Sequence, residues 1–324
     1  MDIPVLDQRT REFLKFLRES GRPDISEIPV TEARATDAKI QAMFASAKPA
    51  AEISGVTIAG NGGKDIHLRI VRPLASAEIL PVAMFFHGGG WILGDADTYD
   101  RLIREIAFGA GVAVVFVEYS RSPEAVYPVP LEECYAAIRW VAEQGSTIGL
   151  SSDRIAVVGD SAGGNMAAAV TLLAKQRKGP RISGQILIYP KTSATFNTPS
   201  FEQFATGYFV SSQTSRWFWR QYAPNPAVDR EPTACPLEAS LDQLRDLPPT
   251  LIIIAECDVL RDEGEYYARK LMQAGVAVTC TRYLGVVHGF LGINALSGIP
   301  AARGAMQQVN SMLREMLGEH CAGQ

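Results

Sequence analysis

The sequence predicts an α/β fold built on a largely parallel sheet, with helices covering both faces. From residue 81 onward, short apolar segments alternate with segments of helical length, and strands that are apolar on both sides are typical of a sheet buried between helix layers. The chain of 324 residues is 47% hydrophobic, so it can bury a large core. The predicted strands are 82–86, 112–119, 154–159, 183–189, 250–256 and 277–284.

The remaining segments are assigned by their periodicity. Residues 6–17 and 31–46 have helical patterns, so the first fifty residues are predicted as amphipathic helices that dock on the rest of the chain. Residues 53–59 and 65–72 alternate apolar and polar side chains around an Asn-Gly-Gly-Lys sequence, which predicts an antiparallel hairpin. Residues 129–144 and 162–177 are expected as helices between strands.

Residues 191–248 interrupt the alternation and are rich in Phe, Trp, Tyr, Pro and Ser. A loop of this length is implausible inside a compact domain, so we interpret the segment as a cap over the carboxyl edge of the sheet. The predicted organisation is N-terminal helices at 1–50 that contribute to the cap, a core at 51–190 and 249–324, and a cap insertion at 191–248.

Composition and charge exclude several classes of partner. The net charge is −4 without any basic cluster, so neither nucleic acid nor an anionic membrane is an expected partner. The N-terminus lacks a signal-peptide core and the later apolar runs are too short to cross a bilayer, so we expect a cytoplasmic protein. The cysteines are widely spaced, which predicts free thiols and no metal site. They are Cys134, Cys235, Cys257, Cys280 and Cys321.

Functional groups in an open parallel sheet lie just beyond the carboxyl ends of its strands. Directly after the strand 154–159 comes Gly159-Asp160-Ser161-Ala162-Gly163, which fits the G-x-S-x-G turn that displays a serine hydroxyl above a sheet. A dinucleotide-binding G-x-G-x-x-G motif would need glycine at 161, and no G-K-[ST] follows, so phosphate binding is disfavoured. The motif predicts that Ser161 is a nucleophile in a strained turn.

A second signal follows the strand 82–86. His87-Gly88-Gly89-Gly90-Trp91 contains three consecutive glycines, whose amides can approach a ligand closely, as an oxyanion hole requires. His87 precedes the expected donors, and we interpret it as a residue that orients this loop. A merely flexible glycine loop is the structural alternative.

Two further strands are followed by an acid and a histidine. Asp258 follows the strand 250–256, and His288 follows the strand 277–284. The order Ser161, Asp258, His288 is the chain order of nucleophile, acid and base on this type of sheet. Asp262 competes for the acid role, whereas His320 lies in a terminal tail where no chemistry is expected. Singly, Asp258 could cap a helix and His288 could be an ordinary loop histidine.

At these residues the sequence resembles the hormone-sensitive-lipase-like group of α/β-hydrolases, also called bacterial family IV esterases. The resemblance covers about residues 80–320 and depends on HGGGW (87–91), GDSAGG (159–164), DVLRDEG (258–264) and HGF (288–290). It implies an α/β-hydrolase fold with a mostly parallel eight-stranded sheet and a helical cap, and hydrolysis of carboxylic esters without a cofactor. It also implies that the amides of Gly88, Gly89 and Ala162 form the oxyanion hole.

The chain departs from the family pattern at two places. Val259 stands where the common acid motif has proline, which should leave the neighbouring carboxylate unaffected. The segment Tyr-Ser-Arg-Ser-Pro-Glu at 119–124 is similar to that of acetyl-esterase-type members, which favours small acyl groups. Within it, Arg121 and Glu124 are interpreted as a solvated or structural ion pair.

Aromatic side chains are the candidates for a substrate pocket. Trp91, Tyr189 and Phe290 follow strands, and Phe209 and Trp217 belong to an aromatic cluster of the predicted cap, for which ordinary packing is the alternative. The resulting hypothesis is a serine esterase that hydrolyses short-chain, small-molecule esters through an acyl-enzyme. Alternatives are an amidase or peptidase on the same scaffold, a non-catalytic small-molecule receptor, and an interfacial lipase. A homodimer formed through the apolar final strand is also compatible with the sequence.

Overall fold

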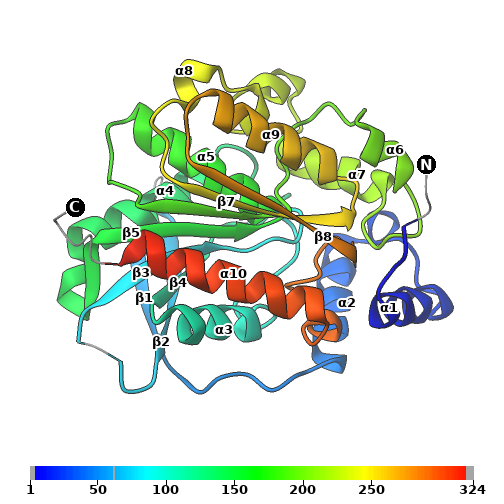
Figure 1. Ribbon diagram of the computed structural model, residues 1–324, viewed down its shortest axis with the longest axis horizontal. Helices are drawn as coiled ribbons and strands as arrows, with labels where there is room; N and C mark the ends of the chain where they lie inside the picture. The colour runs from blue at the N-terminus through cyan, green and yellow to red at the C-terminus, as the bar shows by residue number, and fades with distance from the viewer. Residues whose placement is uncertain (1–3, 61–62, 77, 319–324) are drawn as a thin grey trace.

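The computed structural model describes residues 4–60, 63–76 and 78–318. Its centre is an eight-stranded sheet with the order β1-β2-β4-β3-β5-β6-β7-β8 (Figure 1). The strands are β1 (Ala51–Ala59), β2 (Asp65–Pro73), β3 (Leu80–Phe86), β4 (Ala113–Glu118), β5 (Leu150–Asp160), β6 (Gly184–Ile188), β7 (Thr250–Cys257) and β8 (Val278–Val287).

Most of this sheet is parallel, which confirms the predicted fold class. β1 pairs with β2 and β2 with β4 in antiparallel fashion, whereas β4, β3, β5, β6, β7 and β8 are mutually parallel. The hairpin of β1 and β2 has a continuous register from Ala51 opposite Pro73 to Ala59 opposite Asp65. Part of its predicted turn, residues 61–62, lies outside the described residues.

Helices cover both faces of the sheet, as strands with two apolar faces require. One face packs against α4 (Val129–Gln144), α5 (Ala162–Gln176) and α9 (Arg261–Gln273), and the other against α3 (Asp100–Ala110) and α10 (Pro300–Leu317). Alternate residues of one strand therefore enter different cores: Met84 belongs to the α4–α5 side and Phe85 to the α3–α10 side, and both are fully buried.

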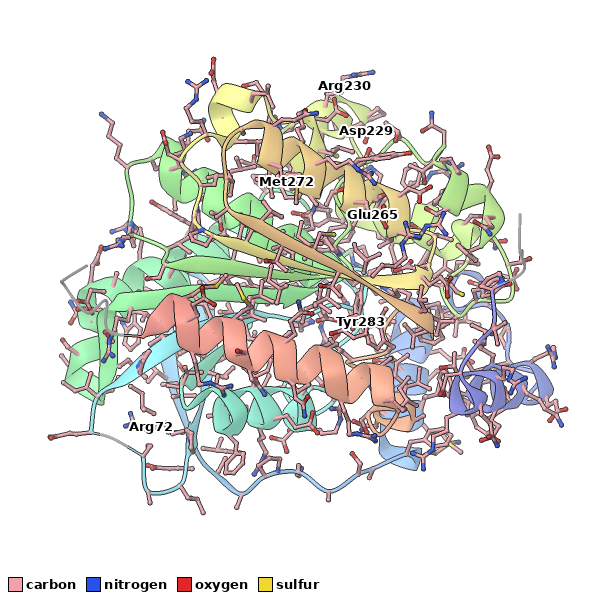
Figure 2. The ribbon with its side chains drawn as sticks, viewed as in Figure 1. Arg72, Asp229, Arg230, Glu265, Met272 and Tyr283 are labelled. Carbon is pink, nitrogen blue, oxygen red and sulfur yellow. The ribbon has the colours of Figure 1, made fainter. Side chains whose placement is uncertain are left out.

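The edge strand β8 shows how both layers are attached. Arg282 Nε donates to Glu265 Oε1 of α9 at 2.7 Å, and the hydroxyl of the next residue, Tyr283, donates to Gln308 Oε1 of α10 at 3.0 Å. Figure 2 shows Glu265 and Tyr283 on opposite sides of the sheet. Strand β8 forms one edge of the sheet, and its pairing with a second copy stays a prediction, which a light-scattering mass would test.

A group of helices lies beyond the carboxyl ends of the parallel strands (Figure 1). It contains α1 (Gln8–Glu19), the short helix η1 (Ile25–Glu27), α2 (Val30–Met43), α6 (Pro199–Gln203) and α7 (Ser212–Tyr222). The N-terminal part and the insertion are joined through Asp24, which accepts hydrogen bonds from the hydroxyls of Ser211 at 3.2 Å and Thr214 at 2.8 Å. We name this group the cap.

The second half of the insertion packs against the side of the sheet that α5 and α9 cover. The helices η4 (Pro226–Arg230), η5 (Pro236–Glu238) and α8 (Leu241–Leu244) follow α7, and buried residues of this stretch join the same core as α5 and α9. The remaining short helices are η3 (Gly145–Ile148) and η6 (Asn294–Leu296). Over the described ranges, no helix is both long and apolar enough to cross a membrane.

Candidate active site

Ser161 occupies a sharp turn between β5 and α5. Its φ is +57° and its ψ is −117°, a backbone conformation that non-glycine residues rarely adopt. Two glycines make the turn possible: a Cβ on Gly159 would overlap the carbonyl oxygen of Gly163, and a Cβ on Gly163 would overlap the carbonyl oxygen of Phe86. The Ser161 N–H donates to the Ile188 carbonyl of β6 at 2.8 Å, which anchors the turn to the sheet.

Ser161, His288 and Asp258 form one chain of hydrogen bonds. His288 Nε2 lies 2.8 Å from Ser161 Oγ, and His288 Nδ1 lies 2.7 Å from Asp258 Oδ2. A carboxylate can only accept, so Nδ1 carries a proton and Nε2 of a neutral imidazole is free to accept from the serine hydroxyl. The structure thus brings together the three side chains that the sequence placed after β5, β7 and β8.

The acid of this group is held rigidly. Asp258 is 1% exposed, and its second oxygen, Oδ1, accepts the N–H of Leu260 at 2.8 Å. The imidazole of His288 packs against the Tyr189 ring with a centroid distance of 4.7 Å. These contacts fix the histidine ring between the acid and the serine hydroxyl.

Asp262, the competing acid, is engaged elsewhere. Its Oδ2 accepts the N–H of Ser200 at 2.7 Å, and its Oδ1 accepts from Arg261 Nε at 2.8 Å. Ser200 lies in the first turn of the cap helix α6, so Asp262 attaches the cap to α9, and both of its oxygens bond to groups other than His288.

The glycine-rich loop after β3 corrects one predicted residue. The N–H of Gly88 donates to Asp160 Oδ1 at 2.8 Å and to the Tyr99 hydroxyl at 3.0 Å, and Gly88 does not line the cavity around Ser161. The structure therefore contradicts Gly88 as an oxyanion donor, because its amide is bound beneath the loop. Gly90, two residues further along the loop, lines the cavity in place of Gly88.

Three amides near Ser161 remain open to a ligand. Gly89, Gly90 and Ala162 all line the cavity. In the part of the chain that the structure describes, none of their N–H groups has an acceptor within the protein. Gly89 has a φ of +91° and Gly90 a φ of +61°, so both depend on glycine for their conformation.

His87 and Asp160 hold this loop from below. His87 Nδ1 donates to the Gly88 carbonyl at 2.8 Å, and its ring stacks on Tyr119 with a centroid distance of 4.3 Å. Burial lowers the pKa of His87 to about 4, so the ring is neutral at pH 7. Asp160 also accepts from the Tyr99 hydroxyl at 3.0 Å, and burial raises its pKa to about 6 despite these hydrogen bonds. His87 thus lies where an orienting residue was expected.

Arg121 and Glu124 do not pair with each other. Arg121 Nη1 donates to the Gly94 carbonyl at 2.7 Å, whereas Glu124 accepts two hydrogen bonds from Arg34 of α2, at 2.7 and 2.8 Å. The Arg34 guanidinium lowers the pKa of Glu124 to about 2. Both residues have structural contacts that fix the cap and the loop beside the site. Among the described residues, no group of three or more His, Cys, Asp or Glu side chains could hold a metal ion.

Known proteins share the fold and much of the sequence of this chain. A family model described as the α/β-hydrolase fold matches residues 83–292. An ethyl acetate hydrolase from Pseudomonas putida is 36% identical, and the match covers 86% of this chain and 90% of the relative. A carboxylesterase from Mycobacterium tuberculosis is 37% identical over 83% of this chain and 84% of its own length. This chain belongs to the hormone-sensitive-lipase-like esterases of the α/β-hydrolase fold.

Solved structures agree with this esterase family. A thermostable esterase from Pseudomonas putida superposes with a TM-score of 0.95 at 44% identity, covering 98% of this chain and 99% of that one. An esterase from Rhizomucor miehei superposes with a TM-score of 0.92 at 38% identity, covering 97% and 98%. The predicted enzyme class, a carboxylic ester hydrolase, is thereby confirmed.

The esterase site opens into a cavity of about 240 Å³ between the sheet and the cap. Of the five aromatic residues predicted for a pocket, Trp91 and Phe209 line it. Tyr189, Trp217 and Phe290 do not. Tyr189 is 1% exposed and packs against His288, and Phe290 is fully buried against Tyr189. Trp217 is half-buried and packs against a small apolar cluster of Ala33, Ile92, Leu93 and Phe218. The prediction for these three was wrong because following a strand or belonging to a cap helix does not determine which way a ring faces.

Several lining residues had no signal in the sequence. Phe218, the neighbour of Trp217 on α7, lies so close to the glycine-rich loop after β3 that a Cβ on Gly90 would overlap its ring. Asp37 of α2 is the least expected lining residue, since this carboxyl group belongs to a helix that was predicted only as an amphipathic cap element. A helical pattern alone could have placed Ile40 on the same face as Asp37, but not the cavity beside them.

Proposed function

We propose that the protein is a serine carboxylesterase that hydrolyses short-chain acyl esters through an acyl-enzyme on Ser161. One observation carries this proposal: Ser161 Oγ lies 2.8 Å from His288 Nε2, in a cavity that also presents amides without protein acceptors among the described residues. A nucleophile, a base and an anion-binding group around one space are the parts that acyl transfer needs.

In the first half of the reaction, Ser161 attacks the ester carbonyl while His288 Nε2 takes its proton. Asp258 holds the imidazole with its proton on Nδ1 and stabilises the imidazolium that forms. His288 then returns the proton to the leaving alcohol as the bond between the carbonyl carbon and the alcohol oxygen breaks. Water attacks the acyl-enzyme with the same base, which releases the acid and restores the serine.

The negative charge of each tetrahedral intermediate develops on the former carbonyl oxygen. The N–H groups of Gly89, Gly90 and Ala162 would receive it, since all three line the cavity beside Ser161. They are backbone groups fixed by the turn and by the loop, so they need little rearrangement during the reaction. Preorganised donors of this kind contribute roughly 3–4 kcal/mol each to stabilising the transition state.

Two observations support short acyl groups as the preferred substrates. Phe218 is 9% exposed and packs over the oxyanion loop, so its ring limits the space next to the reacting carbon. The relative named for ethyl acetate hydrolysis is 36% identical across most of both chains. A cytoplasmic location and a homodimer remain predictions.

The test is the release of p-nitrophenol from acyl esters of two to twelve carbons by the wild-type protein and Ser161→Ala. We expect fast turnover of the shortest esters and a loss of roughly 10⁶-fold in the variant. Turnover that rises toward the longest chains would contradict the short-chain assignment. Retention of more than about a tenth of the wild-type activity by Ser161→Ala would contradict the mechanism.

A further inference from the structure

The cap helix α2 turns one face toward the esterase cavity. Thr36, Asp37, Ile40 and Gln41 all line it, one or two turns beyond the fully buried Ala33. An inward helix face is normally apolar, and a polar side chain there normally has a partner. Asp37 is therefore unusual in its position.

Two polar neighbours of Asp37 on this helix, Arg34 and Gln41, have partners elsewhere in the protein. Gln41 donates to the Gly292 carbonyl at 3.2 Å and accepts the N–H of Asn294 at 2.9 Å. Arg34, on the preceding turn, is paired with Glu124. In the described part of the chain, the Asp37 carboxyl group has neither a hydrogen-bond donor nor an ion-pair partner, although the residue is half-buried.

The charged groups around Asp37 do not neutralise it. Asp95, in the loop after β3, and Asp160, at the end of β5, repel its negative charge, and Arg121, after β4, attracts it. The other cations of the cavity wall, Arg22 and Lys191, form no ion pair with Asp37 within the described ranges, and Lys191 is paired with Glu263 at 2.7 Å. Arg121 is already bonded to the Gly94 carbonyl, and Tyr99 donates its hydroxyl to Asp160. Burial and these two carboxylates raise the pKa of Asp37 to about 7.

A buried carboxylate without a partner destabilises the folded protein unless a ligand supplies the missing positive charge or hydrogen-bond donor. The cavity also contains the rings of Phe209 and Phe218, and aromatic faces attract cations. An ammonium group is the ligand chemistry that suits both a carboxylate and aromatic walls. A substrate carboxylate would be repelled by Asp37.

We infer that Asp37 is a specificity-determining residue that selects esters carrying an ammonium group. The inference builds on the proposed esterase function, because it concerns the part of the substrate that reaches α2 while Ser161 attacks the ester. When Asp37 is ionised, it lowers the free energy of the bound cationic substrate and of its transition state relative to a neutral substrate of the same shape.

The experiment compares acetylcholine with its carbon isostere, 3,3-dimethylbutyl acetate, as substrates of the wild-type protein, Asp37→Asn and Glu32→Gln. Glu32 is exposed on the same helix and does not line the cavity, so Glu32→Gln controls for the general loss of a negative charge. At pH 8, the kcat/KM ratio of acetylcholine to the isostere should be at least about tenfold lower in Asp37→Asn than in the other two proteins.

The pH dependence gives a second readout. Acetylcholine keeps its charge at every pH, whereas Asp37 becomes protonated below about pH 7. The ratio should therefore fall from pH 8 to pH 6 in the wild-type protein and stay constant in Asp37→Asn. The inference is overturned if the ratio is equal in all three proteins at pH 8. It is also overturned if, relative to the wild-type protein, the ratio is lowered as much by Glu32→Gln as by Asp37→Asn.

A second measurement covers the case in which neither alkyl acetate is turned over. Tetramethylammonium at constant ionic strength should inhibit hydrolysis of p-nitrophenyl acetate, with an inhibition constant about tenfold higher for Asp37→Asn than for the wild-type protein. Equal inhibition constants overturn the inference and leave the esterase function standing. Failure of the wild-type protein to hydrolyse p-nitrophenyl acetate itself overturns the proposed function.

Discussion

Replacing Asp160 by asparagine should make the stability of the protein less dependent on pH and should lower its activity. Asp160 is 3% exposed, lies directly before Ser161 and accepts the N–H of Gly88 and the hydroxyl of Tyr99. Burial raises its pKa from an ordinary value of 3.8 to about 6. The folded protein therefore holds this proton more tightly than the unfolded chain does.

The sign of the stability effect follows from these two pKa values. The contribution of Asp160 is most favourable below about pH 4, and it is lost as the pH rises toward 6, because the ionised group is disfavoured in the fold. The full loss corresponds to about 3 kcal/mol, of which about 2 kcal/mol falls between pH 4.5 and pH 8. Asparagine does not ionise, so the variant lacks this loss.

Unfolding by urea gives the stability of the variant and of the wild-type protein at each pH. The quantity to compare is the stability difference between the two proteins at pH 8 and the same difference at pH 4.5. The stability of Asp160→Asn relative to the wild-type protein should be about 2 kcal/mol higher at pH 8 than at pH 4.5, because only the wild-type protein loses stability as the pH rises. This comparison cancels any hydrogen bond lost at both pH values. A relative stability that is the same at pH 4.5 and pH 8 would show that folding does not raise the pKa of Asp160.

The activity of the same variant should fall. The carboxylate of Asp160 attracts the positive charge that His288 acquires during catalysis, and it anchors the oxyanion loop through Gly88. Asparagine carries no charge and offers one acceptor oxygen in place of two, which should lower kcat for p-nitrophenyl acetate by about 10- to 100-fold at pH 8. An unchanged kcat would show that the Asp160 charge does not contribute to the reaction.

Further predictions address single parts of the site. Gly90→Ala should lower kcat at least about 100-fold, because the new Cβ overlaps Phe218 and displaces an oxyanion amide, whereas Gly21→Ala, with open space around it, should leave kcat unchanged. Asp258→Asn should lower kcat about 10⁴-fold, and Asp262→Asn should mainly lower the melting temperature, since Asp262 holds α6; the reverse result would transfer the acid role. Phe218→Ala should shift the kcat/KM profile toward longer acyl chains, whereas Trp217→Ala should not; a shift only in Trp217→Ala would contradict the assigned cavity wall.

Much of the fold could be predicted because each parallel strand is apolar on both sides and bounded by turn residues. The six predicted strands from residue 82 onward correspond to β3–β8, and α4 begins and ends as its pattern indicates. The grouping of Ser161, Asp258 and His288 could be predicted from their positions in the chain, since the carboxyl ends of neighbouring parallel strands meet at one edge of the sheet.

The errors concern directions that a linear pattern does not encode. A run of three glycines does not indicate which of their amides faces the cavity. The hydrogen bond from the Gly88 N–H to Asp160 shows that this amide faces away from it. Trp217 and Phe218 are neighbours on α7, so which ring enters the cavity depends on how the helix packs. Asp37 escaped notice for the same reason, since the surroundings of α2 come from distant parts of the chain.

Covalent trapping can show whether Ser161 is the nucleophile. The wild-type protein and Ser161→Ala would be treated with a p-nitrophenyl alkylphosphonate, followed by measurement of the intact mass and of the labelled peptide. We predict a single adduct on Ser161, with loss of esterase activity in step with labelling, and no adduct in the variant. An adduct on another residue, or full activity after complete labelling of Ser161, would contradict the account.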